Sequence, residues 1–291
     1  MIEEHKKVCR TETEMDLVHN NTYRIHSIGY AVVYPSNMME LKSVFSIVKK
    51  YKTKYLVLGN GSNVILPDYY VGVIIKLKIG KCIVTGNKVY VPSWYMLNKL
   101  AINLSEKGYT GLEWATGIPG TIGGAIYGNA EAYKIPISSL IDKIMIFDGE
   151  KEIEYSPEDM HFGYRTSILK GTNNLIILGA VLNLEKGNKE EIKSLIKDRT
   201  KRRIETQPLE YPSCGSVFRN PSDNYAGKLI EDLGLKGYRV NDAMVSKKHA
   251  NFIINTGNAT SKDIISIIKK IKKEVKKSYK INLIEEVEII K

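Results

Sequence analysis

The stretch GLEWATGIPGTIGGAIYGNA, residues 111–130, is unusually rich in glycine. Within about a dozen residues it carries Gly117, Gly120, Gly123, Gly124 and Gly128. Because glycine has no Cβ, such a backbone can approach a ligand closely and turn several N–H groups toward one point. A pyrophosphate suits a nest of this kind, although ordinary turns would explain the glycines equally well. The surrounding sequence therefore has to decide between a ligand site and a set of turns.

Another glycine-rich loop lies upstream, in LGNGSNVIL at residues 58–66, so this is the first glycine loop in chain order and residues 111–130 form the second. It follows the second strand of a βαβ-like unit, which we expect as a strand at 31–34, a helix at 37–51 and a strand at 55–58. A Rossmann fingerprint would follow the first strand and open a helix, and a P-loop would need Gly-Lys-Ser/Thr, so neither fits. Two long glycine loops between apolar strands nevertheless favour a dinucleotide-like cofactor.

Strands and helices are mixed along the rest of the chain without strict alternation, which indicates an α+β fold. We expect further strands at 71–78, 81–94, 143–156, 174–184, around Ser216, at 250–260 and at 281–291, with 81–94 and 143–156 as hairpins. We expect further helices at 95–107, 188–205, 226–233 and after Thr260, where Thr260 and Asp263 form a capping box. The segment TQPLEYP, residues 206–212, is the expected domain boundary.

The bulk composition excludes several classes of protein. Of the 291 residues, 43% are hydrophobic and 26% charged, an ordinary globular balance. The apolar run at 175–184 is too short to span a bilayer, and the charged N-terminus has no signal-peptide core, so we expect no membrane insertion. Cys9, Cys82 and Cys214 are too widely spaced for a disulfide framework or a metal knuckle, which fits a cytoplasmic protein.

The net charge of +11 does not by itself indicate a nucleic-acid partner. Much of it comes from lysines in KKIKKEVKKSYK, where an isoleucine stripe at helical spacing leaves the lysines on the opposite face. We therefore interpret the charge as a solvated helix face and expect no nucleic-acid binding, while an anionic small substrate would also benefit. The five histidines lack metal-ligand spacing, so we expect no metal site.

Three polar residues are candidates for chemistry, each with a plainer alternative. Ser216 lies in YPSCGSVFRNP, residues 211–221, which is not a nucleophile elbow and reads locally as a turn. Arg165, in FGYRTSIL, is by itself more typical of an ion pair. Glu286 and Glu288 share one face of the terminal strand and Glu285 the other, where each could simply face solvent.

Taken together, several stretches in order resemble the UDP-N-acetylenolpyruvoylglucosamine reductase family. They are LGNGSNVIL, GLEWATGIPGTIGGAIYGNA, GYRTSIL, QPLEYPSCGSVFRNP, AGKLIEDLGLKGYRV, VSKKHANFIINTGNAT and LIEEVEII. The resemblance covers nearly the whole chain after about residue 15, and the length fits the shorter subtype, which lacks an inserted substrate-capping segment. It implies a vanillyl-alcohol-oxidase-type FAD-binding region at 1–205, in two subdomains of about 20–75 and 76–205. A C-terminal substrate domain would follow at 206–291.

The resemblance also implies an activity. An NADPH-dependent flavoenzyme of this kind reduces UDP-N-acetylglucosamine enolpyruvate to UDP-N-acetylmuramate for peptidoglycan, with hydride from flavin N5. FAD would lie against Gly59, Asn60, Gly61, Ser62, Asn63, Thr116, Gly117, Ile118, Pro119, Gly120, Thr121, Gly123, Gly124, Ala125 and Asn129. Tyr133 and Asn220 would contact the substrate. The expected partners are these small molecules, with no obligate protein partner.

The same resemblance implies catalytic roles. Arg165 and Glu286 would stabilise the negative charge that hydride transfer creates next to the carboxylate, and Ser216 would donate the proton that quenches it. The chemistry suits these residue types, because a guanidinium can hold an oxyanion with two donors and an enolate carbon is a strong base.

Some positions differ from the family's usual pattern. They are His26 and Ser27, Glu131, Thr206, Asn241 and Asp242, and Glu288. The differences leave two alternatives open. One is an oxidase or dehydrogenase of the same fold, for which His26 would be the candidate tether of FAD. The other is a divergent flavin-binding paralogue with weak or no turnover.

Overall fold

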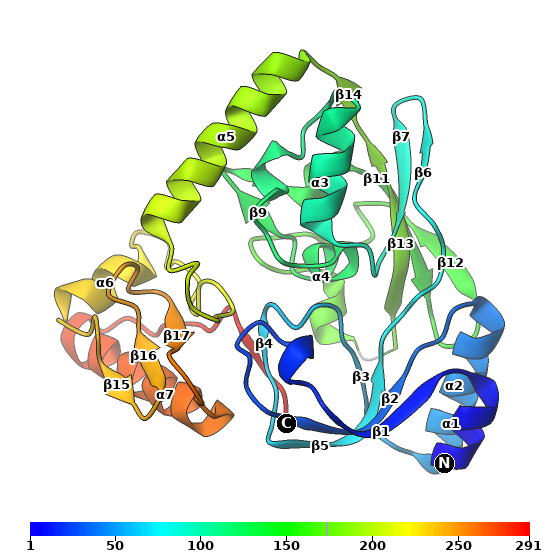
Figure 1. Cartoon of the computed structure of the whole chain (residues 1–291), viewed down its shortest axis with the longest axis horizontal. Coiled ribbons are helices and arrows are strands. Elements are labelled where there is room, and N and C mark those ends of the chain that lie inside the picture. The colour runs from blue at the N-terminus through cyan, green and yellow to red at the C-terminus, as the bar shows by residue number, and fades with distance from the viewer. Residues whose placement is uncertain (173) are drawn as a thin grey trace. The chain divides into compact units, whose positions relative to one another are not determined.

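The computed structural model describes residues 1–172 and 174–291 (Figure 1). The backbone forms two compact units, each assembled from separate stretches of chain. Unit 1 comprises Met1–Thr13, Tyr30–Asn60 and Val71–Lys201, and unit 2 comprises Glu14–Gly29, Gly61–Tyr70 and Arg202–Lys291. The chain therefore passes repeatedly from one unit to the other. The domain boundary expected between residues 205 and 206 stays a prediction.

A four-stranded sheet near the N-terminus contains the expected strand–helix–strand unit. Its order is β1-β2-β5-β3, with β1 at Thr11–Asp16, β2 at Ile28–Val33, β3 at Tyr55–Val57 and β5 at Tyr69–Ile75. Helices α1 (Ile2–Val8) and α2 (Met38–Tyr51) lie beside one another (Figure 1). Helix α2 begins where predicted, because the Asn37 side chain accepts a hydrogen bond from the Glu40 amide at 2.9 Å.

A five-stranded antiparallel sheet supports the second glycine loop in unit 1. Its order is β12-β11-β13-β7-β6, from β6 (Ile83–Thr85), β7 (Lys88–Pro92), β11 (Ile141–Phe147), β12 (Glu152–Tyr155) and β13 (Ile176–Asn183). Both predicted hairpins, β6–β7 and β11–β12, are confirmed. Helices α3 (Leu97–Glu106) and α4 (Ile122–Tyr127) share a core with this sheet, centred on the fully buried Trp114.

Unit 2 is built around the long helix α7 (Ser261–Tyr279). Its isoleucine stripe is buried, as predicted, against the three-stranded sheet of β15 (Arg239–Val240), β16 (Ala243–Val245) and β17 (Ile253–Asn255) and against helix α6 (Ala226–Asp232). The predicted capping box of Thr260 and Asp263 is confirmed. Tyr23, Ile25 and Ile65 from the early stretches belong to the same core.

The remaining elements are short, apart from helix α5 (Lys189–Thr206). The strands are β4 (Val64–Ile65), β8 (Tyr109–Thr110), β9 (Glu131–Ala132), β10 (Ile135–Pro136), β14 (Glu185–Lys186) and β18 (Glu288–Ile289). The 3₁₀ turns are η1 (Val18–Asn20), η2 (Glu113–Ala115), η3 (Ile137–Leu140) and η4 (Ile168–Gly171).

Two strand predictions in unit 2 were wrong. The segment around Ser216 forms only single bridges, from Ser216 to Phe252 and from Phe218 to Glu285, and the terminal strand shrinks from 281–291 to β18. The Val217 amide donates to the Asn251 carbonyl and the Val217 carbonyl accepts from the Glu286 amide, so the segment makes one isolated bridge on each side and the pairing is not continued. In unit 1, helix α4 was not expected, because its two glycines weaken the helical pattern.

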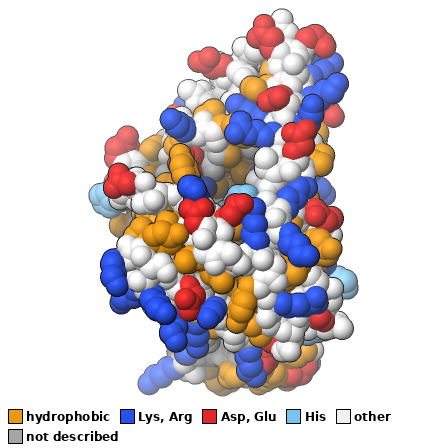
Figure 2. Space-filling view, turned by 90° about the vertical axis from the view of Figure 1, so that its left-hand side faces the viewer, with side chains coloured by type: hydrophobic (Ala, Val, Ile, Leu, Met, Phe, Trp, Pro, Cys, Tyr) orange, Lys and Arg blue, Asp and Glu red, His pale blue; other side chains and the backbone are white. Residues whose placement is uncertain are grey.

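Charge on the surface is mixed in sign. Figure 2 shows Lys and Arg side chains interspersed with Asp and Glu on the face that it presents. Within unit 2, Lys272 bonds to Glu285 at 2.7 Å, so part of the lysine face of α7 is paired. In the part of the chain that the structure describes, no helix has the length and apolar character needed to cross a membrane. Nor do the described residues bring three or more His, Cys, Asp or Glu side chains together as a metal site would.

Candidate active site

The two glycine-rich loops meet in unit 1, although about sixty residues separate them. The Asn60 side chain donates a hydrogen bond to the Pro119 carbonyl at 2.6 Å. A Cβ added at Gly59 would stand only 2.6 Å from Thr121 Oγ1. Glycine is therefore required at position 59 so that the loops can touch.

Helix α4 begins directly at this contact. Thr121 is its N-cap, and its hydroxyl accepts a hydrogen bond from the Gly124 amide at 3.3 Å. The next turn packs on the end of β7, where the Gly123 amide donates to the Ser93 carbonyl at 2.8 Å and an added Cβ would lie 2.9 Å from the Ser93 Cβ. The second loop is thus anchored to the five-stranded sheet.

The exposed edges of these loops fit the diphosphate of a dinucleotide. Gly59, Gly117 and Pro119 are exposed, while Gly120 and Thr121 are buried beneath them. At Gly59 and Gly117, backbone without side chains is therefore presented to solvent above a buried base, which allows an anion to approach closely. Lys76 lies at the same place and donates to the Gly59 carbonyl at 3.3 Å. Burial, with a smaller contribution from Lys78, lowers the pKa of Lys76 to about 8.

Arg165 occupies a tight turn of unit 1 with a left-handed backbone, φ 56°. Such a conformation is uncommon for arginine and persists only where the surroundings impose it. Here Gly163 and Thr166 bridge the turn by hydrogen bonds of 3.1 and 3.3 Å between their backbones. The Asn129 side chain donates to the Gly163 carbonyl at 3.0 Å. The Arg165 turn is therefore stabilised both by its own backbone hydrogen bonds and by the side chain of Asn129.

Asn129 is consequently more than a loop residue. It is 6% exposed, and its side-chain oxygen also accepts from the Ser138 amide at 3.3 Å. Its predicted contact with FAD stays a prediction, whereas its contacts with the Arg165 turn are observed. Neighbouring Tyr133, a predicted substrate contact, is 39% exposed with the Arg199 guanidinium 4.7 Å from its ring centroid.

Unit 2 brings Ser216 and Glu286 onto adjoining segments. The Glu286 amide donates to the Val217 carbonyl at 2.8 Å, directly after Ser216. Both Ser216 and Glu286 are half-buried. Glu285, by contrast, bonds to Lys272, so alternation along the terminal segment separates the two carboxylates. Arg165, the third predicted catalytic residue, belongs to unit 1.

The end of the first glycine loop is bonded to the same terminal segment. The Asn63 side chain donates to the Glu286 carbonyl at 3.0 Å, and the Asn63 carbonyl accepts from the Glu288 amide at 3.0 Å. Gly61 has φ +64°, and a Cβ there would collide with the Asn20 carbonyl at 2.3 Å. Predicted flavin-loop residues thus also hold the segment that carries Glu286.

Cys214 joins the Ser216 segment to that loop. Its sulfur lies 3.4 Å from the Val64 carbonyl and 3.6 Å from the Gly61 carbonyl. Burial raises the pKa of the Cys214 thiol to about 12, so the group is neutral and unreactive at physiological pH. Asn220, the predicted substrate contact downstream, is exposed, and its side-chain oxygen accepts from the Ala226 amide at the start of α6, at 3.1 Å.

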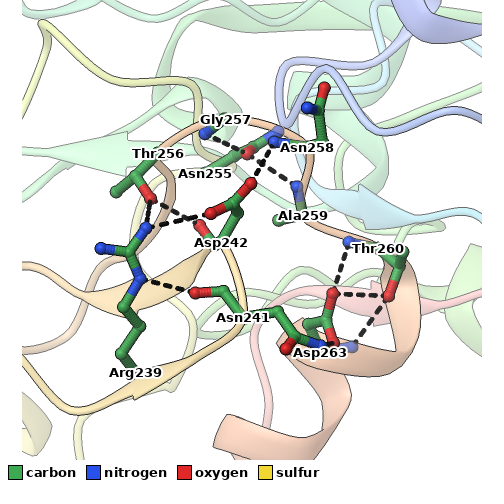
Figure 3. A network of polar contacts seen from close by, with 10 residues as sticks. All are labelled: Arg239, Asn241, Asp242, Asn255, Thr256, Gly257, Asn258, Ala259, Thr260 and Asp263. Carbon is green, nitrogen blue, oxygen red and sulfur yellow. Dashed lines mark hydrogen bonds and ion pairs between the residues drawn. The ribbon is translucent and has the colours of Figure 1, made fainter.

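Asn241 and Asp242, which replace the usual glycines, are built into a polar network (Figure 3). Asn241 has φ +48°, so it keeps a backbone conformation that glycine adopts easily. Its side chain donates to Asp263 at 2.7 Å. Asp242 accepts from Arg239 at 3.0 Å and from the Asn258 amide at 2.8 Å. Asn241 thus adopts a positive φ, and both side chains make polar contacts within the network.

His26 and Ser27, the other pair that differs from the family's usual pattern, make separate polar contacts. Ser27 is fully buried and donates to the Pro67 carbonyl at 2.6 Å. His26 is exposed and pairs with Asp16 at 2.6 Å. Both contacts lie within unit 2.

Sequence reasoning missed several supporting residues. Asn251, Glu113 and Ser93 are all buried and polar, and none was predicted to have a role, although Glu113 and Asn251 lie in two of the family-like stretches. Glu113 accepts from the Thr110 hydroxyl at 2.7 Å and from the Gly111 amide at 3.0 Å, at the start of the glycine stretch. The apolar neighbours in GLEWA were the available signal, because a carboxylate among them must be hydrogen-bonded.

Comparison with known proteins identifies the fold. Residues 207–290 match the family model described as UDP-N-acetylenolpyruvoylglucosamine reductase, C-terminal domain, and residues 30–146 match an FAD binding domain. A UDP-N-acetylenolpyruvoylglucosamine reductase of Bacillus cereus is 40% identical over 97% of this chain and 95% of its own length. The chain belongs to the UDP-N-acetylenolpyruvoylglucosamine reductase family.

Other members of this reductase family are similar to the chain in sequence and in structure. The Clostridium kluyveri reductase is 45% identical over 88% of this chain and 85% of its own length. The crystal structure of the Thermus caldophilus reductase has a TM-score of 0.84 at 32% identity, covering 97% of this chain and all of that one. These findings confirm the predicted α+β fold with its vanillyl-alcohol-oxidase-type FAD-binding domain, and the prediction of an FAD-dependent oxidoreductase.

Proposed function

We propose that this chain reduces UDP-N-acetylglucosamine enolpyruvate to UDP-N-acetylmuramate, with NADPH as reductant, in the cytoplasm as a step of peptidoglycan precursor synthesis. FAD, when bound, would supply the hydride chemistry that links NADPH to the substrate. The two glycine loops, joined by the Asn60–Pro119 hydrogen bond and the close contact of Gly59 with Thr121, would hold its diphosphate, because their exposed backbone allows an anion to approach closely.

Ser216 supplies the proton in this proposal. Hydride addition to the terminal vinyl carbon of the substrate leaves an electron pair on the adjacent carbon, and that pair takes the proton of the Ser216 hydroxyl. The two additions together convert the double bond into a single bond. Ser216 is half-buried, so a substrate can reach its hydroxyl while bulk water is partly excluded.

Arg165 and Glu286 stabilise the charge that develops on the substrate. The guanidinium offers a planar pair of donors to the carboxylate, and the left-handed turn at Arg165 fixes the direction in which the side chain leaves the backbone. Glu286 is fixed close to Ser216 by the 2.8 Å bond between its amide and the Val217 carbonyl. A carboxylic acid at this position donates a hydrogen bond to the developing enolate when it carries its proton.

The observation that carries this proposal is the family membership, shown by a reductase that is 40% identical over 97% of the chain. The purified protein should be yellow and should release intact FAD on denaturation. NADPH should bleach the flavin, and the enolpyruvyl sugar nucleotide should restore its absorbance, giving a product with two more hydrogen atoms by mass spectrometry. A flavin that NADPH bleaches but the sugar nucleotide leaves reduced would favour the divergent paralogue. A colourless protein that takes up no FAD would contradict both readings.

A further inference from the structure

The Ser216 segment needs a specific device to fix its position. It forms only single bridges, to Phe252 and Glu285, so no continuous strand ladder sets its register. A proton donor has to be placed to well within an ångström of the carbon that it protonates. Something other than sheet pairing must therefore hold the backbone that follows Ser216.

Asn251 holds this backbone in the described structure. Its side-chain oxygen accepts from the Phe218 amide at 3.0 Å, and its side-chain nitrogen donates to the Phe218 carbonyl at 2.8 Å. Its own carbonyl accepts from the Val217 amide at 2.8 Å. One asparagine thus satisfies three backbone polar groups of two consecutive residues, the Val217 amide and both polar groups of Phe218.

The opposite edge of the segment meets the terminal chain. The Val217 carbonyl accepts from the Glu286 amide at 2.8 Å and is 3.4 Å from the Val287 amide. Val217 and Phe218 are therefore held between Asn251 on one edge and the Glu286 segment on the other. Both residues are 1% exposed, and Asn251 is 4% exposed, so water cannot replace a lost bond.

We propose that Asn251 is a positioning residue, which sets the register of Ser216 against Glu286 through the amide and carbonyl of Phe218. The inference rests on the proposed function and adds to it a residue that touches neither substrate nor cofactor. Loss of the Asn251 donor leaves the Phe218 carbonyl buried and unsatisfied, so the segment shifts to find another donor. Such a shift slows proton delivery and spares flavin reduction by NADPH, which does not use Ser216.

The test uses the change Asn251→Asp. The introduced carboxyl group keeps an oxygen for the Phe218 amide, but when ionised it cannot donate to the Phe218 carbonyl. When protonated it donates again, and burial raises the pKa of such a group above its usual value. Oxidation of reduced flavin by the enolpyruvyl substrate should therefore be about 10- to 100-fold slower than in the wild type at high pH. The ratio of variant to wild-type rate should recover as the pH falls from about 8 to about 5.

Two further variants separate positioning from stability. Asn251→Leu removes both bonds and should be slow at every pH, with no recovery in acid. Asn255→Asp is the matched control, because Asn255 is 2% exposed and its side chain donates to the Tyr23 carbonyl at 2.9 Å, away from the Ser216 segment. It should lose stability in a urea titration yet show no acid recovery of the second half-reaction.

Stopped-flow absorbance of the flavin, recorded for each half-reaction across the pH range, tests whether Asn251 positions Ser216. Recovery in acid by N251D alone, with flavin reduction unchanged, supports the proposal. A pH-independent ratio near one for N251D, or the same acid recovery in N255D, overturns it while leaving the proposed function intact. A wild type whose reduced flavin the substrate does not oxidise overturns the proposed function, and the role of Asn251 with it.

Discussion

The contact between the two glycine loops makes a quantitative prediction for Gly59→Ala. The new methyl group would stand 2.6 Å from Thr121 Oγ1, which is about 0.8 Å short of ordinary contact. Thr121 can rotate away only by giving up its cap on the Gly124 amide, a loss of about 1 kcal/mol. If the loops part instead, the bond between Asn60 and Pro119 is lost, at about the same cost. We therefore expect the free energy of unfolding to fall by about 1–2 kcal/mol.

A double-mutant cycle with Thr121 isolates this contact. Thr121→Ala alone should cost about 1 kcal/mol, because it removes the cap. In that background Gly59→Ala should cost almost nothing, because the nearest remaining atom is the Cβ of residue 121, at 3.6 Å. Thr121→Ser is the matched control, since it keeps the hydroxyl and should keep the penalty. Urea titrations of the four variants give the coupling energy, expected at about 1–2 kcal/mol.

FAD binding provides the second measurement. If the joined loops hold the cofactor, Gly59→Ala should weaken FAD affinity about tenfold for each 1.4 kcal/mol that binding must spend to close them. Flavin fluorescence titration of apoprotein measures this directly. Additive stability losses for Gly59→Ala and Thr121→Ala, or unchanged FAD affinity in a destabilised Gly59→Ala protein, would refute the reasoning.

Other substitutions test separate parts of the structure. Ser216→Ala should leave flavin reduction nearly unchanged and slow oxidation by the substrate about 10²–10⁴-fold, with Ser216→Cys less impaired, in stopped-flow absorbance. Arg165→Lys should slow oxidation by the substrate more than reduction by NADPH, because lysine lacks the planar fork; equal losses would indicate a structural role. The pKa of Lys76 is lowered to about 8, so the unfolded chain binds more protons there between pH 8 and the ordinary lysine pKa of 10.5. Wild-type stability should therefore rise with pH through that window relative to Lys76→Met, and parallel pH curves in urea titrations would contradict this. Asp263→Ala breaks the capping box of α7 and should cost about 1 kcal/mol in the same assay, whereas no loss would mean that Thr260 caps the helix alone.

Local signals in the sequence predicted local structure well. The helix caps at Asn37 and Thr260 could be predicted from the sequence, because the partner of each cap lies three residues away, within the first turn of its own helix. The two hairpins could be predicted because Gly86 and Gly149 lie at their turns. In the structure both glycines have the positive φ that such turns require. In these places the sequence neighbours are also the structural neighbours.

The Ser216 segment shows why other predictions could not succeed. Val217 and Phe218 are apolar and β-branched or aromatic, so they resemble a strand, yet their hydrogen bonds go to residues 251 and 286. Nothing in the local pattern says which distant residue will supply a donor. Asn251 was overlooked for the same reason, because an asparagine beside a strand is typical of a turn. Resemblance to a family indicated the candidate acid, and only the structure located its support.

The interrupted chain path of unit 2 has a consequence for the order in which the protein can fold during synthesis. The core of this unit combines Tyr23, Ile25 and Ile65 with side chains from the last third of the chain. Its final pairing joins Glu288 and Ile289 to Val64 and Ile65. The early stretches must therefore wait, with apolar side chains uncovered, until Glu288 and Ile289 have left the ribosome. A fragment that ends before Glu288, or one that starts at residue 207, would lack part of this core, so the Ser216 segment should reach its final position only after residues 288 and 289 have been synthesised.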